Sequence, residues 1–173
     1  QNFKIYHSNG GYKSVHKALK NMTPDEVSGE VKKSGLRGRG GAGFSMAFKL
    51  ESCKNAVSDS KFIVCNAGEG DPGAYSDRYI MEQRPHALLM GMMLAGYITG
   101  AAYGVVYIRA EYPESIEEIE KSIAYLRKET LIGKTINGSS FSFDFKIIKA
   151  QGAYICGEET ALLSSLEGQR PEV

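Results

Sequence analysis

A glycine-dense segment, residues 35–43, has the composition of an anion-binding loop. It contains five glycines together with Arg37 and Arg39. Glycine permits positive backbone torsions and a close approach of amides to a ligand, successive amides can form a concave anion site, and guanidinium groups suit phosphate. A flexible linker is the alternative, but linkers favour serine and carry fewer arginines. The segment lacks the Gly-Lys-Ser/Thr ending of a Walker loop. It therefore predicts phosphate binding of another kind.

Two further polar loops each follow a predicted strand. Residues 66–75 begin with Asn66, placed to contact a ring edge or a ribose, and include Glu69 and Asp71, which can accept hydrogen bonds from sugar hydroxyls or a carboxamide. Asp77, beyond this loop, is equally well explained as a helix cap or as a functional residue. Residues 151–157 lead into a helix N-terminus that offers free amides to an anion. The acids at positions 158 and 159 also favour the helix dipole, which is a structural explanation for them.

The elements that position these loops alternate between helix and strand. A capping threonine, a proline at the first helical position and acids in the first turn predict a helix from residue 24. The patterns predict helices at residues 24–33, 45–57, 87–97 and 158–166, a long helix opening at Pro113, and strands at 61–66, 105–108 and 141–148. Such alternation predicts an α/β fold with a doubly wound, mostly parallel sheet. Ligands of such sheets bind beyond the carboxyl ends of the strands.

Composition excludes several classes of function. The 173 residues carry 21 Lys and Arg against 20 Asp and Glu, with no basic run interleaved with aromatics, so we expect no nucleic-acid partner. The three cysteines are widely spaced and form no CxxC pair, so the chain alone supplies neither a zinc site nor an iron–sulfur site, and we expect free thiols. The histidines are scattered, without the spacing of a catalytic triad or of metal ligands.

Residues 87–108 contain no charge and are long enough to span a bilayer. Their pattern changes midway, from a helix rich in Met and Leu to a β-branched strand. We therefore expect a buried helix, a glycine-marked turn and a strand. Gln1–Tyr12 is polar and lacks the apolar core of a signal peptide.

Three strings, SGLRGRGGAGF (34–44), CNAGEGDPGAYSDRYIME (65–82) and GAYICGEETALLSSLEG (152–168), closely resemble the NADH- and FMN-binding subunit of respiratory complex I. The same module occurs in diaphorase subunits of NAD-linked hydrogenases and formate dehydrogenases. The resemblance covers the chain from about Thr23, which leaves residues 1–22 as an N-terminal extension. It implies a Rossmann-like domain (23–173) in which hydride passes from NADH to FMN and electrons pass singly to iron–sulfur clusters of partner subunits. The cofactor does the chemistry, so no catalytic acid or base is expected.

The resemblance also assigns residues. It implies that the FMN phosphate and ring are lined by Gly38, Arg39, Gly40, Gly41, Ala42 and Lys49. It implies that Asn66, Glu69, Tyr154, Gly157 and Glu158 complete the flavin pocket. It implies that Phe44, Asp71 and Glu159 face NADH, with Phe44 stacking on it.

Some positions depart from the family pattern. Gly68 stands where the family has an aspartate that contacts flavin, Asp71 replaces a glutamate, and residues 45–50 replace Pro-Thr-Gly-Leu-Lys-Trp. A second hypothesis is therefore an assembly or binding module that kept the fold and lost flavin. A third, a nucleotide-binding transferase, lacks a Mg²⁺-binding Ser or Thr after a lysine. The family's ubiquitin-like domain and cysteine-ligated four-iron cluster are not within these residues, so we expect incomplete activity from them alone. The expected location is cytoplasmic, at the membrane only through partner subunits.

Overall fold

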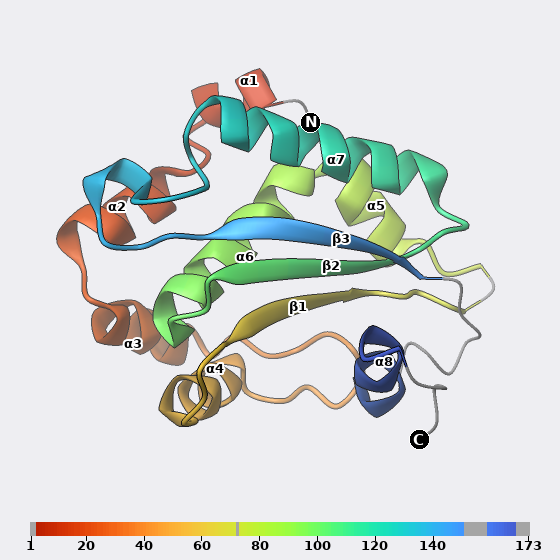
Figure 1. Cartoon of the computed structure of the whole chain (residues 1–173), viewed down its shortest axis with the longest axis horizontal. Helices are drawn as coiled ribbons and strands as arrows, with labels where there is room; N and C mark the ends of the chain where they lie inside the picture. The colour runs from red at the N-terminus through yellow and green to blue at the C-terminus, as the bar shows by residue number, and fades with distance from the viewer. Residues whose placement is uncertain (1–2, 72, 151–158, 169–173) are drawn as a thin grey trace.

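A parallel three-stranded sheet forms the centre of the protein (Figure 1). The computed structural model describes residues 3–71, 73–150 and 159–168. The strands are β1 (Phe62–Ala67), β2 (Tyr103–Arg109) and β3 (Asp144–Ala150), in the order β1-β2-β3. Phe62 lies opposite Tyr103, which lies opposite Asp144, so all three carboxyl ends meet at one edge. The predicted α/β parallel-sheet fold is confirmed.

Helices cover both faces of this sheet. Val106 and Ile108 of β2 pack into the main core, whereas the side chain between them, Tyr107, packs with Leu162 on the other face, because successive strand residues point to opposite sides. The helices α5, α6 and α7 lie on the first face and α8 on the second (Figure 1). The helices are α1 (Phe3–Ser8), α2 (Lys13–Asn21), α3 (Pro24–Ser34), α4 (Met46–Asn55), α5 (Ser76–Gln83), α6 (Pro85–Thr99), α7 (Pro113–Lys128) and α8 (Glu159–Leu166), with a 3₁₀ turn η1 (Ile136–Gly138).

Local signals place the helix ends where the sequence predicts them. The Thr23 hydroxyl and the Glu26 carboxylate form a capping box at the start of α3, and Gly35 ends the helix at φ 65°. Gly100, at φ 76°, ends α6 before β2 begins. The uncharged segment is thus a helix, a turn and a strand, as predicted. In the part of the chain that the structure describes, no helix has the length and apolarity needed to cross a membrane.

Two glycines allow close packing around the phenylalanine rings at the start of β3. A Cβ on Gly96 would lie 2.4 Å from Cε2 of Phe143, and a Cβ on Gly104 would lie 2.8 Å from Cδ1 of Phe145. Atoms cannot approach so closely without displacement of the rings. Gly96 is therefore required where α6 packs on Phe143, and Gly104 is required where β2 lies beside the Phe145 ring of β3.

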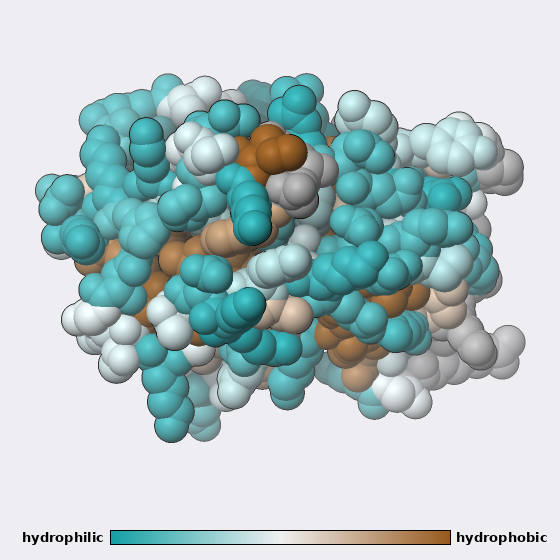
Figure 2. All heavy atoms as spheres, turned by 90° about the horizontal axis from the view of Figure 1, so that it is seen from above, coloured by the Kyte–Doolittle hydropathy of each residue, from teal (hydrophilic) through white to brown (hydrophobic). Residues whose placement is uncertain are grey.

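Residues 3–22 also join this core. Tyr12 and Val15 are buried in the main apolar cluster, and the Tyr12 hydroxyl is 2.8 Å from Nδ1 of His86. Burial lowers the pKa of His86 to about 4, which keeps the ring neutral near pH 7. The outer surface above the sheet, over α1 and α7, is mainly hydrophilic, with only separate apolar areas (Figure 2).

One predicted strand is displaced. The alternation from Phe141 predicts a strand over 141–148, but β3 begins at Asp144. Phe143 instead forms an isolated antiparallel bridge with Gly133 while its ring packs beneath Gly96. Alternating aromatics continue through both arrangements, so the pattern alone does not separate the bridge from the strand.

Candidate functional site

The first glycine loop connects α3 to α4 and is closed at its base by backbone hydrogen bonds. The N–H of Gly38 donates to the carbonyl of Phe44 at 2.8 Å, and the N–H of Met46 donates to the carbonyl of Leu36 at 3.0 Å. The loop extends toward the edge of the sheet where the strands end and then returns to α4 (Figure 1). Residues 39–43 thus form a projecting tip on a short two-stranded base.

The tip is open and depends on glycine. Gly41 and Gly43 have φ values of 119° and 59°, which L side chains rarely adopt. Arg37 Nη1 donates to the Gly43 carbonyl at 3.1 Å, so this arginine holds the loop, while Arg39 is exposed. A cavity of about 370 Å³ lies against this loop, lined by residues 34–39 and Gly43.

Phe44 and Lys49, both predicted site residues, lie together at the end of this loop. Lys49 Nζ is 5.8 Å from the centroid of the Phe44 ring, and the Phe48 ring is 5.5 Å from the same ring. Phe44 and Phe48 are 47% and 59% exposed. The Ser45 hydroxyl accepts the N–H of Phe48 and caps α4, which fixes the start of the helix beside the loop.

The second loop begins where β1 ends. Asn66 is exposed, and its Oδ1 accepts the N–H of Gly68 at 3.1 Å. Asp71 is also exposed, and its carbonyl accepts the N–H of Ala74 at 3.1 Å. Asn66, near the carboxyl end of β1, and Glu69 and Asp71, in the loop that follows, therefore lie in one short segment at the carboxyl edge of the sheet.

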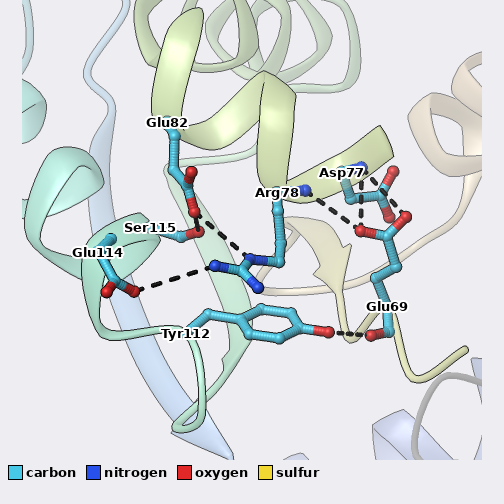
Figure 3. Close-up of polar contacts among 7 residues, drawn as sticks. All are labelled: Glu69, Asp77, Arg78, Glu82, Tyr112, Glu114 and Ser115. Atoms are coloured by element: carbon cyan, nitrogen blue, oxygen red, sulfur yellow. Dashed lines mark hydrogen bonds and ion pairs between the residues drawn. The ribbon is translucent and has the colours of Figure 1, made fainter. Parts of the chain in front are cut away.

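Glu69 caps α5 (Figure 3). Its carboxylate accepts the Ser76 hydroxyl at 2.7 Å and the N–H groups of Asp77 and Arg78 at 3.1–3.2 Å. Burial opposes ionisation of Glu69, but these hydrogen bonds outweigh it and lower the pKa of the carboxyl. The suggestion that Asp77 is the cap is wrong, because Asp77 lies inside the first turn and donates to Glu69. Burial, and then the Glu69 charge, raise the pKa of Asp77.

Sequence reasoning missed two residues that hold this loop. The Tyr112 hydroxyl donates to the carbonyl of Glu69, and Arg78 lies over the Tyr112 ring (Figure 3). Arg78 lies within the string 65–82 that carries the family resemblance, whereas Tyr112 lies between the second and third strings. No local spacing connects these two residues, which are far apart in the chain, so no signal in the sequence pairs them.

The third loop, the cysteines and possible metal ligands add little to the description of the site. Tyr154, Gly157 and Glu158 lie outside the described residues, as do Cys156 and the side chain of Glu159. Cys53 and Cys65 are free thiols, as expected, and burial together with the nearby Asp77 raises the pKa of Cys65 to about 12. Within residues 3–71, 73–150 and 159–168, no group of three or more His, Cys, Asp or Glu side chains could hold a metal ion.

These features define an α/β domain with polar loops at the carboxyl edge of a parallel sheet, where such sheets bind ligands, and an arginine-bearing glycine loop suited to an anion. Comparison with known proteins identifies the family. The sequence model of the Nuo51 FMN-binding domain matches residues 31–173, and the chain belongs to this family. The predicted resemblance is thereby confirmed.

Individual relatives agree with this assignment. The chain is 47% identical to the F 2 subunit of NADH-quinone oxidoreductase from Rhizobium meliloti (strain 1021), over 96% of this chain and 40% of that protein. It is 48% identical to the HndC subunit of the NADP-reducing hydrogenase from Solidesulfovibrio fructosivorans, over 94% of this chain and 33% of that protein. A crystal structure of an NAD⁺-reducing NiFe hydrogenase superposes with a TM-score of 0.80 at 32% identity, covering all of this chain and 29% of the other. The chain thus spans well under half the length of these relatives.

Proposed function

We propose that this chain is the FMN- and NADH-binding core of an oxidoreductase subunit. The observation that carries the proposal is the match of an FMN-binding family across residues 31–173, a range that contains all three polar loops. Relatives named for NADH-quinone oxidoreductase and for NADP-reducing hydrogenase support a nicotinamide substrate. When bound, FMN supplies the ability to accept a hydride and to release electrons one at a time.

The first loop fits the phosphate of such a cofactor. An added Cβ at Gly40 or Gly41 would meet no atom within 4 Å, so the tip can lie against a ligand through its backbone. Arg39 is exposed beside it and can donate charge-assisted hydrogen bonds to phosphate oxygens. In this proposal Ala42 of the tip and Gly38 at the base of the loop also line the phosphate.

The side chains after the tip fit a planar ring. Phe44 and Phe48 present exposed aromatic surface of the kind that stacks on a heteroaromatic group. Lys49, next to Phe44, can donate to a ring oxygen or a phosphate. In the proposal Phe44 and Asp71 face NADH, while Asn66 and Glu69 border the flavin.

The protein's contribution is binding and orientation, because the reacting atoms belong to the two cofactors. The proposed partners are iron–sulfur subunits of a complex I-like or hydrogenase-like assembly. The proposed location is the cytoplasm, with any membrane association made through those subunits.

Titration with FMN tests the proposal directly. We expect quenching of flavin fluorescence with a dissociation constant of about 1 μM or below, corresponding to roughly 8 kcal/mol. Addition of NADH without oxygen should then bleach the flavin absorbance. Absence of both FMN and NADH binding in the intact protein would contradict the proposal.

Gly68 supports a second candidate, a module of the same family that has lost flavin. The loop closes through the Gly68 N–H and Asn66 without needing an acidic side chain at position 68. Gly68→Asp distinguishes the candidates. A gain of tenfold or more in FMN affinity would indicate decay of a flavin site, and no gain would remove the argument from Gly68.

A further inference from the structure

We propose that Tyr112 and Arg78 are positioning residues, which fix the loop 66–71 in the geometry that the cofactor requires and act through Glu69. This inference rests on the proposed function, since it assigns a role in cofactor binding to residues outside the predicted contact set. Tyr112 immediately precedes α7 and Arg78 lies in α5, so the pair joins two helices to the loop.

Tyr112 holds the backbone of the loop. Its hydroxyl donates to the carbonyl of Glu69 across a separation of 43 residues in the chain. Pro113 follows as the first residue of α7, which restricts the backbone on which the tyrosine is mounted. The phenol therefore reaches the loop from a rigid helix end, and the bond sets the direction of one loop peptide.

Arg78 holds the Tyr112 ring. Its guanidinium carbon is 4.8 Å from the ring centroid, a cation–π distance. Its Nε lies 3.4 Å from Oε1 of Glu82, and its Nη2 lies 4.0 Å from Oε2 of Glu114. Glu82 is in turn fixed by the Ser115 hydroxyl at 2.8 Å. Figure 3 shows the guanidinium between the two glutamates, with the Tyr112 ring beside it and its hydroxyl directed at Glu69.

Glu69 is consequently held at both ends. Its carboxylate is bound by the first turn of α5, which contains Arg78, and its carbonyl is bound by Tyr112. Loss of either tie leaves one end of the residue able to rotate. The bonds converge on a loop at the carboxyl edge of the sheet, where a ligand binds, and this location favours preorganisation of a site as their role.

Tyr112→Phe tests the hydrogen bond from the Tyr112 hydroxyl to the Glu69 carbonyl, with Tyr125→Phe as the matched control. The first change removes the hydroxyl and keeps the ring beneath Arg78, and the second removes the hydroxyl of an exposed tyrosine within α7, the helix that Tyr112 precedes. We expect Tyr112→Phe to raise the dissociation constant of FMN about fivefold. We also expect amide hydrogen exchange over residues 66–71 to accelerate about tenfold. Tyr125→Phe should change neither quantity by more than about twofold.

Arg78→Lys tests the contact between the Arg78 guanidinium and the Tyr112 ring, with Arg127→Lys as its control. Arg127 binds Asp144 and the carbonyl of Phe145 at the other end of α7, so its loss weakens the fold without touching the loop. We expect Arg78→Lys to weaken FMN binding by several fold and Arg127→Lys to lower the thermal midpoint while leaving FMN affinity unchanged. Comparison of the change in FMN affinity with the change in thermal midpoint separates a positioning role from a general effect on stability.

The two measurements keep this inference distinct from the proposed function. If wild-type protein binds FMN and Tyr112→Phe binds it equally well, the positioning role is overturned and the proposed function stands. If wild-type protein binds no FMN, the proposed function fails. Hydrogen exchange then still tests whether the Tyr112 hydroxyl holds the loop through the Glu69 carbonyl. Faster amide exchange of the loop in Tyr112→Phe would support the inference that Tyr112 fixes the loop, and unchanged exchange would contradict that inference.

Discussion

The two described loops at the candidate site are built in opposite ways. The loop 35–45 is closed by backbone bonds at its base and by the bond from Arg37 to Gly43, and its tip carries exposed Arg39 and two glycines, Gly40 and Gly41, whose missing side chains would meet no atom within 4 Å. The loop after β1 is tied down by side chains, with Asn66 and Glu69 bound locally and Tyr112 reaching it from another helix.

This difference separates two requirements of a binding site. An open tip can approach a phosphate closely, but ordering its long side chains on binding costs free energy, of the order of 1 kcal/mol for each one. A braced loop has already incurred that cost in folding and presents its groups in a fixed direction. We therefore expect substitutions in the first loop to change mainly affinity, and substitutions in the second to change stability and affinity together.

Removal of the Arg39 side chain should give the largest effect. Arg39→Ala deletes a charge-assisted donor to phosphate, so FMN affinity should fall about 30-fold, or roughly 2 kcal/mol, as measured by fluorescence titration. The thermal midpoint should not change, because the side chain is exposed. Arg39→Lys, which keeps the charge, should recover part of the affinity. An unchanged affinity in Arg39→Ala would contradict the assignment of the first loop to phosphate.

Removal of the Glu69 side chain should show the opposite behaviour. Glu69→Ala leaves the first turn of α5 without its acceptor, and the free energy of unfolding should fall by about 1–2 kcal/mol in urea denaturation. Glu117→Ala, which removes an exposed partner of Lys121 on α7, is the control and should cost about 0.5 kcal/mol or less. Equal effects of the two changes would show that the second loop is not braced through Glu69.

Two neighbouring glycines refine the comparison within the first loop. Gly41→Ala places a side chain at φ 119° and should destabilise the protein by about 1 kcal/mol. Gly40→Ala meets neither a positive φ nor a neighbouring atom, so its effect on stability should stay within about 0.5 kcal/mol. Both should weaken FMN binding if the backbone of the tip contacts the ligand. Retention of full affinity by Gly40→Ala would place that contact elsewhere.

The smallest expected effect is a dependence on pH. The pKa of Glu69 is lower in the folded protein than in the unfolded chain, so its ionised form stabilises the fold. The stability advantage of wild type over Glu69→Gln should be complete above the unfolded pKa and decline as the pH falls through the folded pKa. Urea denaturation of both proteins from pH 7 into the acid range measures this difference. A difference that stays constant with pH would mean that the charge of Glu69 is not what holds α5.

Much of this arrangement could be predicted from the sequence because its signals are local. The capping box of α3, the turn at Gly100 and the change from Leu and Met to β-branched residues after it each act over a few positions. The three polar loops were recognisable from composition and from family resemblance. The alternation of helices and strands along the chain also predicted the parallel sheet.

The contacts that were not predicted depend on distant residues. Tyr112 and Glu69 are 43 positions apart, so no local sequence pattern indicates that the hydroxyl donates to this carbonyl. The sequence identified Glu69 as a possible acceptor for a ligand. Its hydrogen bonds to the first turn of α5 could not be predicted, because they depend on the fold of the chain between Gly70 and α5. The bridge at Phe143 likewise depends on Gly133, ten residues earlier and outside the alternating pattern.

The order of the sheet has a consequence for synthesis of the protein. β1, β2 and β3 lie side by side in the order in which the ribosome makes them, so each new strand meets a neighbour that has already emerged. Tyr12 is different, because its partner His86 is 74 residues later. We expect the first two helices to remain undocked on nascent chains until α6 has left the exit tunnel, and the sheet to be completed after that.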